Sequence, residues 1–145
     1  MELLPIQQTL EENTQFLHHP DCESSLSMSV EFFNRIGYTP PWIGYYAQLN
    51  GNLVGSGAFK GKPKDGRVEI AYGILPHYQQ QGICTELCRQ LVILALKTDP
   101  AVKVTARTFL PDNPSTRILK KNGFVCSGTV WDDEDGTVWE WEYTQ

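Results

Sequence analysis

The sequence predicts a single-domain α/β protein with a mixed, mostly antiparallel twisted sheet and helices on both faces. A β-rich run, a long apolar-striped helix over 82–98 and another strand form a central βαβ unit, which implies parallel pairing and a right-handed crossover. Turn residues at Asn50-Gly51-Asn52 and Asp135-Gly136, each between two β-rich runs, indicate antiparallel hairpins on both sides of that unit. A chain of 145 residues is the size of one domain, which we expect to cover residues 1–145.

The first half of the chain is expected to supply the outer part of the sheet. Pro5 interrupts the first short strand, and Gly37 is suited to end the second helix because glycine adopts the left-handed conformation of a helix end. The expected strand, two helices and three further strands cover residues 1–6, 8–18, 24–36, 42–49, 53–59 and 67–75.

The second half begins with the long helix, which Asp99-Pro100 stops because proline disfavours helix at the residue before it. Alternating apolar and polar residues then predict a strand, and Asn113 is suited to cap the short helix that follows. The expected helix, strand, short helix and terminal hairpin cover residues 82–98, 102–108, 114–122, 124–131 and 137–143.

Composition excludes several classes of function. A net charge of −5 argues against nucleic acid as a main partner, which needs a basic face. No apolar run approaches the ~18 residues of a membrane span, and the start lacks the basic region of a signal peptide, so we expect a cytoplasmic protein without a membrane partner. The acidity suits a cationic amine substrate, and it equally suits solubility alone.

The cysteines and histidines do not predict a metal site. Cys84 and Cys88 share one helix face, where the favoured interpretation is two buried small side chains rather than a redox pair. The cluster over 18–22 contains adjacent histidines that point apart, and no second cluster completes a tetrahedral site. We therefore expect no metal cofactor.

The most informative stretch covers residues 76–86, between a strand and the long helix. A helix N-terminus carries roughly half a positive charge and several unpaired amides, so it attracts anions. Gly82 lacks a Cβ and lets an anion approach the backbone closely. The first interpretation is therefore a phosphate-binding loop.

The amino-acid sequence of this loop resembles the Pro-x-x-(Arg/Gln)-x-x-Gly-x-(Gly/Ala) signature of the GNAT superfamily of acetyl-CoA-dependent N-acetyltransferases. Gln79 and Gly82 match the signature, whereas Cys84 stands where Gly or Ala is usual and Gln80 replaces a common glycine. The order of elements is similar to the GNAT fold over nearly the whole chain. The resemblance implies acetyl-CoA as co-substrate, with its pyrophosphate held by Gln79, Gln80, Gln81, Gly82, Ile83, Cys84 and Thr85.

A second motif over 112–124 is similar to the Asn-x-x-Ser-x-x-x-Leu-x-Lys-x-Gly-Phe pattern, which is strongest in the branch of ribosomal-protein N-terminal acetyltransferases. The resemblance implies that Asn113 contacts the pantetheine arm of the cofactor. Asn113 is one residue closer to Ser115 than usual, so either the chain has a one-residue deletion or Asp112 takes that place.

Acetyl transfer to an amine requires a base, an oxyanion donor and a partner for the leaving thiolate. We expect Glu69 to be the base, because it shares a strand face with two very small residues and relatives use a glutamate here. The alternative is a structural carboxylate paired with Arg67, Arg107 or a lysine.

We expect Ser115 to hydrogen-bond the leaving sulfur, because the tyrosine of many relatives is Leu119 here. The alternative for Ser115 is a helix cap. The resemblance places the oxyanion donor at a backbone amide near Ile74 or Leu75, where family members splay two strands apart.

The acceptor site is expected beside the terminal hairpin, where an acidic turn over 132–135 precedes Trp139, Trp141 and Tyr143. The favoured interpretation of these residues is a solvated turn and an aromatic core face, and the alternative is a site for a cationic amine.

The leading hypothesis is an N-acetyltransferase that moves an acetyl group from acetyl-CoA to a primary amine, either a small amine or a peptide N-terminus, by direct attack in a ternary complex. A non-catalytic acyl-CoA-binding or sensor module is the alternative. A toxin-type enzyme acting on charged tRNA is disfavoured by the acidic composition. A homodimer is compatible with the sequence.

Overall fold

One seven-stranded sheet runs through the protein in the order β1-β2-β3-β4-β5-β7-β6. The structure is a computed structural model that describes residues 1–144, the side chain of Glu23 excepted. β4 and β5 are parallel, and every other neighbouring pair is antiparallel. The strands are β1 (Glu2–Pro5), β2 (Gly44–Leu49), β3 (Asn52–Phe59), β4 (Arg67–Ile74), β5 (Lys103–Thr108), β6 (Phe124–Asp132) and β7 (Gly136–Tyr143).

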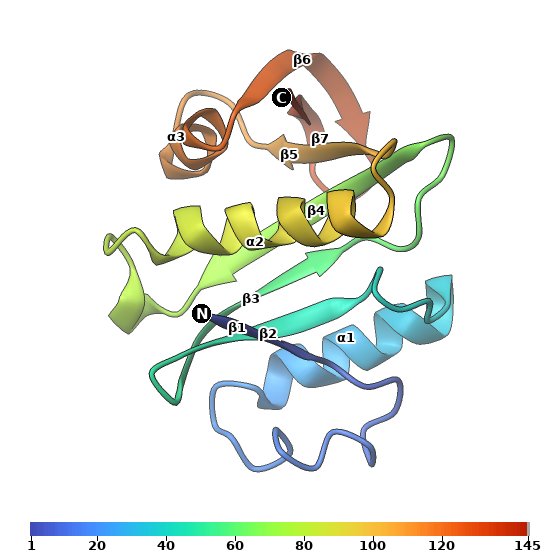
Figure 1. Ribbon diagram of the computed structural model, residues 1–145, viewed down its shortest axis with the longest axis vertical. Coiled ribbons are helices and arrows are strands. Elements are labelled where there is room, and N and C mark those ends of the chain that lie inside the picture. Colours follow the sequence, from blue (N-terminus) through green and yellow to red (C-terminus); the bar gives the residue numbers. More distant parts are fainter. Residues whose placement is uncertain (145) are drawn as a thin grey trace.

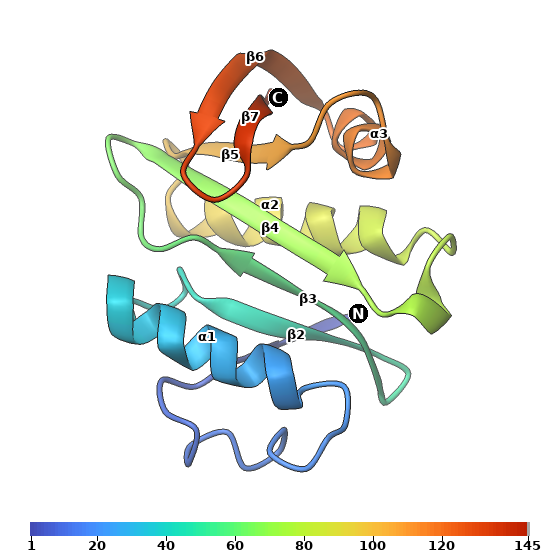
Figure 2. The same ribbon diagram turned by 180° about the vertical axis from the view of Figure 1, so that it is seen from behind.

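Helices cover both faces of the sheet (Figures 1 and 2). α1 (Glu23–Ile36) covers one face of the sheet, beside β1, β2 and β3. α2 (Ile83–Thr98) and α3 (Pro114–Lys121) lie on the opposite face. A short 3₁₀ turn (Pro76–Tyr78) joins β4 to the loop before α2. The order β4-α2-β5 forms the expected central βαβ unit, so the predicted fold class is confirmed.

The apolar stripe of α2 packs closely on the middle of the sheet. Its buried residues are Ile83, Leu87, Cys88, Leu91, Val92 and Ala95. A Cβ on Gly57 of β3 would lie 2.9 Å from Leu91 Cδ1 and 3.1 Å from Leu87 Cδ1. A glycine at position 57 therefore allows helix and sheet to approach this closely.

The hairpin between β2 and β3 confirms the turn that the sequence predicts. Asn50 and Gly51 have φ values of 53° and 82°, and two consecutive residues with positive φ are typical of a type I′ turn.

The predicted helix over 8–18 is wrong, because the described chain has no α-helix before Glu23. The buried side chain of Asn13 organises this segment instead. Its Oδ1 accepts the amide of Gln7 at 2.7 Å, and its Nδ2 donates to the carbonyls of Gln7 and Thr9 at 3.1 and 2.7 Å. These bonds hold a compact loop because an Asn side chain competes with the helical pattern for backbone partners.

β4 separates from β5 halfway along its length. The two strands pair from Arg67 with Lys103 to Ile70 with Ala106, whereas β4 stays paired with β3 as far as Ile74. The second half of β4 therefore has a partner on one side only, next to the loop that begins α2 (Figure 2).

Candidate active site

The separation of the strands leaves backbone amides of β4 facing the gap. Leu75 donates its amide to the carbonyl of Val54 at 2.8 Å. Hydrogen bonds alternate along an antiparallel ladder, so the amide of the preceding residue, Ile74, points away from β3 toward the gap. Of the two residues expected near the oxyanion donor, Ile74 therefore has the available amide and Leu75 does not.

The loop before α2 folds back on itself through two residues in the left-handed region, Gln80 with φ 63° and Gly82 with φ 75°. Side chains fasten this loop to the end of β4. Gln79 Nε2 donates to the carbonyl of Ile74 at 3.3 Å, and Gln81 Nε2 donates to the carbonyl of His77 at 3.2 Å.

The same loop presents unpaired amides to solvent. Within residues 1–144, the backbone amides of Gln81, Gly82 and Cys84 find no acceptor in the protein, and the first helical bond of α2 runs from Glu86 to Gly82. A Cβ on Gly82 would meet no atom within 4 Å, so the space beside it is open. Unpaired amides at the positive end of a helix, with open space beside a glycine, fit an anionic phosphate group.

Cys84 lies half-buried in the first turn of α2, where the expected family pattern has a smaller residue. Burial raises the pKa of the Cys84 thiol to about 11. The thiol therefore stays protonated and adds no negative charge to the loop at neutral pH.

Glu69 and Ser115 line one cavity of about 650 Å³, together with Asp112 and Asn113. The cavity lies between β4, β5, the chain leading into α3 and the β6–β7 turn. Ile74 and Leu75 line a second, smaller cavity of about 170 Å³ beside Ser25 of α1. The fold thus brings the two expected catalytic residues together. Of the residues expected to bind the pyrophosphate, 79–82 lie on the exposed loop before α2 and 83–85 lie in the first turn of α2, where Ile83 is buried.

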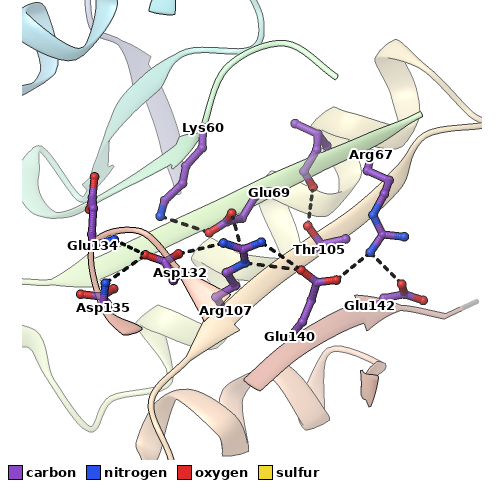
Figure 3. A network of polar contacts seen from close by, with 11 residues as sticks. Lys60, Arg67, Glu69, Thr105, Arg107, Asp132, Glu134, Asp135, Glu140 and Glu142 are labelled. Atoms are coloured by element: carbon purple, nitrogen blue, oxygen red, sulfur yellow. Dashed lines mark hydrogen bonds and ion pairs between the residues drawn. The ribbon is translucent and has the colours of Figure 1, made fainter. Parts of the chain in front are cut away.

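The carboxylate of Glu69 lies between two cations (Figure 3). Its Oε2 is 3.1 Å from Lys60 Nζ, and its Oε1 is 3.8 Å from Arg107 Nε. Arg67, one of the expected partners, instead pairs with Glu140 at 2.9 Å and Glu142 at 2.8 Å. The structural alternative for Glu69 is therefore realised with Arg107 and Lys60, in the cavity that Glu69 shares with Ser115.

Sequence reasoning placed Asp132 in a solvated turn and missed its ion pair with Arg107. Asp132 is buried, and the hydrogen bond from Arg107, followed by the amides of Glu134 and Asp135, lowers its pKa to about 2. The expected solvated turn is correct for residues 133–135 and wrong for Asp132. One sequence signal could have predicted this role: Asp132 begins an acidic turn that ends in glycine. In such turns the first carboxylate accepts hydrogen bonds from the backbone amides two and three residues later.

The aromatic residues of β7 lie on the opposite sheet face from its glutamates, because side chains alternate along a strand. Trp141 is buried, donates Nε1–H to Thr108 Oγ1 at 2.9 Å and lies 6.0 Å from the Lys120 ammonium of α3. The core interpretation of Trp139, Trp141 and Tyr143 is confirmed, and these residues do not line the Glu69 cavity.

Asn113, and not Ser115, caps α3. Asn113 Oδ1 accepts the amides of Ser115 at 2.9 Å and Thr116 at 3.2 Å, and its Nδ2 donates to the carbonyls of Phe109 and Pro111. The cap alternative for Ser115 is therefore wrong. The Asn113 amide group is fully engaged, so a pantetheine contact would have to replace one of these bonds.

Asp112, the other residue considered for that contact, is also engaged. Its carboxylate accepts a hydrogen bond from Thr116 and lies 3.6 Å from Lys120 Nζ. The Ser115 hydroxyl, in contrast, is exposed and has no partner within residues 1–144.

The described residues contain no cluster of three His, Cys, Asp or Glu side chains arranged to hold a metal ion. Across residues 1–144, none of the helices combines the length and apolarity needed to cross a membrane.

Comparisons with known proteins agree with this geometry. The family model described as "Acetyltransferase (GNAT) domain" matches residues 4–125. A curated relative, the uncharacterized N-acetyltransferase YjdG of Bacillus subtilis (strain 168), is 30% identical over 77 residues, which cover 52% of this chain and 46% of that protein. The match thus spans about half of the relative's length.

Solved structures extend the likeness. Aminoglycoside acetyltransferase AAC(6')-Ib in complex with coenzyme A is 26% identical, with a TM-score of 0.62 over 71% of this chain and 66% of that chain. A spermidine N-acetyltransferase SpeG chimera from Vibrio cholerae and hSSAT is 13% identical, with a TM-score of 0.74 over 99% of this chain and 95% of that chain. The second likeness shows the fold alone.

Proposed function

Because the chain belongs to the family of GNAT acetyltransferase domains, we propose that it is an N-acetyltransferase moving an acetyl group from acetyl-CoA to a primary amine by direct attack in a ternary complex. The observation that carries this proposal is the meeting of Glu69 and Ser115 in one cavity, on a sheet whose β4 and β5 separate beside it. The coenzyme A bound to the related AAC(6')-Ib supports the choice of cofactor.

The fit of the loop before α2 to a phosphate group supports the proposal that this loop holds the cofactor's pyrophosphate. The amides of Gln81, Gly82 and Cys84 would donate to the phosphate oxygens, and the open side of Gly82 would admit them. The bound cofactor supplies a thioester carbonyl that an amine can attack. The amide of Ile74 faces the gap as the oxyanion donor, and one such donor is typically worth roughly 2.7–4 kcal/mol.

Glu69 and Ser115 would handle the protons at this site. Glu69 accepts the proton that the attacking amine must lose, directly or through water. Within residues 1–144, the Ser115 hydroxyl has no partner to give up before it hydrogen-bonds the leaving sulfur. A serine hydroxyl is a weak acid, so its role is hydrogen bonding rather than full proton transfer.

The acceptor that we propose is a small cationic amine. The related AAC(6')-Ib is named as an acetyltransferase of aminoglycosides, which are cationic amines. A peptide N-terminus is the second acceptor class, favoured by the similarity of residues 112–124 to the ribosomal-protein branch.

Chromatographic measurement of free CoA released from acetyl-CoA tests this function across spermidine, kanamycin and short peptides with free N-termini. We expect release with at least one acceptor class and only slow background hydrolysis without an acceptor. Acetyl-CoA binding without release for every acceptor would favour the non-catalytic sensor module. Absence of both binding and release would refute the proposal.

A cytoplasmic location and a homodimer stay predictions. The outer strand β6 exposes Val125 at 57% and Trp131 at 71%, which gives a second copy an apolar edge to pair with. Sedimentation at several protein concentrations measures the oligomeric state.

A further inference from the structure

The two cations that face Glu69 are held very differently (Figure 3). Arg107 Nη1 lies 2.9 Å from Asp132 Oδ2, and Arg107 Nε lies 3.4 Å from Glu140 Oε2. Its distance to Glu69, 3.8 Å, is the longest of the three. Arg107 is therefore fixed by other carboxylates whether or not Glu69 is available.

Among the described residues, Lys60 forms its one ion pair with Glu69. Its Nζ lies 3.1 Å from Glu69 Oε2. Its backbone amide donates to the carbonyl of Glu69 at 2.8 Å, so the backbone is fixed while the side chain, 38% exposed, can turn toward solvent. An ion pair between a flexible lysine and a partly exposed carboxylate contributes little free energy, so replacing the carboxylate by water costs the lysine little.

We propose that the Lys60 ammonium holds the place beside Glu69 that the ammonium group of the acceptor takes, so that Lys60 sets the specificity of the site by competing with cationic acceptors. This inference rests on the proposed function and assigns the contact that selects its substrate class. It makes the acceptor a cationic primary amine that is small enough for a cavity of about 650 Å³.

The charges around the cavity favour this exchange. Four carboxylates line the cavity: Glu69, Asp112, Asp132 and Asp135. The lining has two cations, Lys60 and Arg107, so Arg107 alone remains when Lys60 turns toward solvent. An incoming ammonium restores the pairing of Glu69. The proton then passes from that ammonium to the Glu69 carboxylate, which leaves the neutral amine that can attack.

Replacing Lys60 by methionine tests the exchange, because methionine keeps an unbranched stem and removes the charge. Lys62→Met is the matched control, since Lys62 lies in the same turn and forms no ion pair among the described residues. For Lys60→Met we expect the KM for spermidine to fall roughly two- to five-fold, the range of a partly exposed ion pair, with kcat within about two-fold of wild type. The KM for an arylamine, which is uncharged at pH 7, should not fall.

Two kinetic results would overturn the inference. An unchanged or higher KM for spermidine in Lys60→Met would show that Lys60 does not compete with the acceptor. A lower kcat at constant KM would make Lys60 a residue that only positions Glu69.

A binding measurement separates this inference from the proposed function. Spermidine is titrated calorimetrically into wild type and Lys60→Met, each with saturating CoA. Tighter binding by the variant supports the inference even where no acceptor is acetylated, an outcome that would refute the proposed function alone. Equal or weaker binding by the variant overturns the inference even where wild type is active.

Discussion

Gly82→Val is the most informative perturbation of the cofactor loop. Any side chain at position 82 meets two separate costs. The left-handed conformation with φ 75° strains an L-residue by roughly 1–2 kcal/mol, whatever is bound. In addition, the valine side chain fills the open space that would admit a phosphate, and losing one charge-assisted hydrogen bond costs roughly 1.5–3 kcal/mol. We therefore expect the Kd for acetyl-CoA to rise roughly 10- to 150-fold.

Gly66→Val isolates the first cost. Gly66 also has φ 75°, and a Cβ there also meets nothing within 4 Å, but it lies in the turn before β4. Both variants should lose about 2–8 °C in Tm. Calorimetric titration with acetyl-CoA should show weakened binding for Gly82→Val alone. Unchanged affinity in that variant, or equal losses in both, would refute the phosphate-binding role of the loop.

Three further predictions follow from the contacts of the site. Glu69→Gln should lower kcat roughly 10²- to 10⁴-fold, the range of general-base catalysis, and leave the Kd for acetyl-CoA within about two-fold. Full activity across pH 6 to 9 would exclude Glu69 as the base. Ser115→Ala should lower kcat and change the free energy of unfolding by no more than about 0.5 kcal/mol. Asn113→Ala should lower the free energy of unfolding by ~1–2 kcal/mol, because it removes the cap of α3. Urea unfolding of both variants distinguishes the two roles. Asp132→Asn should cost ~1.5–3 kcal/mol at pH 7, since the hydrogen bond from Arg107 lowers the folded-state pKa of Asp132 to about 2. A lowered pKa stabilises the fold above the unfolded-state value near 3.9, so the gap between variant and wild type should close as the pH falls from about 4 to about 2, and a gap constant with pH would contradict this origin.

Local patterns were enough to predict much of the fold. Residues 82–98 carry a helical stripe, and Asn50-Gly51 has the residue types of a type I′ turn, so both are readable from neighbouring residues. The loop at Gln79 to Gly82 was equally accessible, because its glycine and its position before a helix are features of the sequence.

Features that depend on contacts between residues far apart in the chain could not be predicted from the sequence. Asn13 lies in a segment with acceptable helical spacing, and only its bonds to Gln7 and Thr9 show that the segment is a loop. The two cations beside Glu69 come from the residue after β3 and from β5, and the sequence does not state how these strands align with β4, so Lys60 was one lysine among several.

The same limit applied to the terminal hairpin. The alternative interpretation placed Asp132 and Trp141 together in a site for a cationic amine, but strand alternation around the β6–β7 turn sends them to different environments. Their separation leaves the carboxylates, and not the tryptophans, at the Glu69 cavity.

An amide-resolved NMR titration of the ¹⁵N-labelled protein with CoA tests the central claim most directly, since backbone amides are the groups assigned to the cofactor. We predict that the largest shifts fall on residues 80–85 and on Ile74, with no change at Gly66. Shifts confined to other parts of the chain, or no saturable shifts at all, would contradict the account.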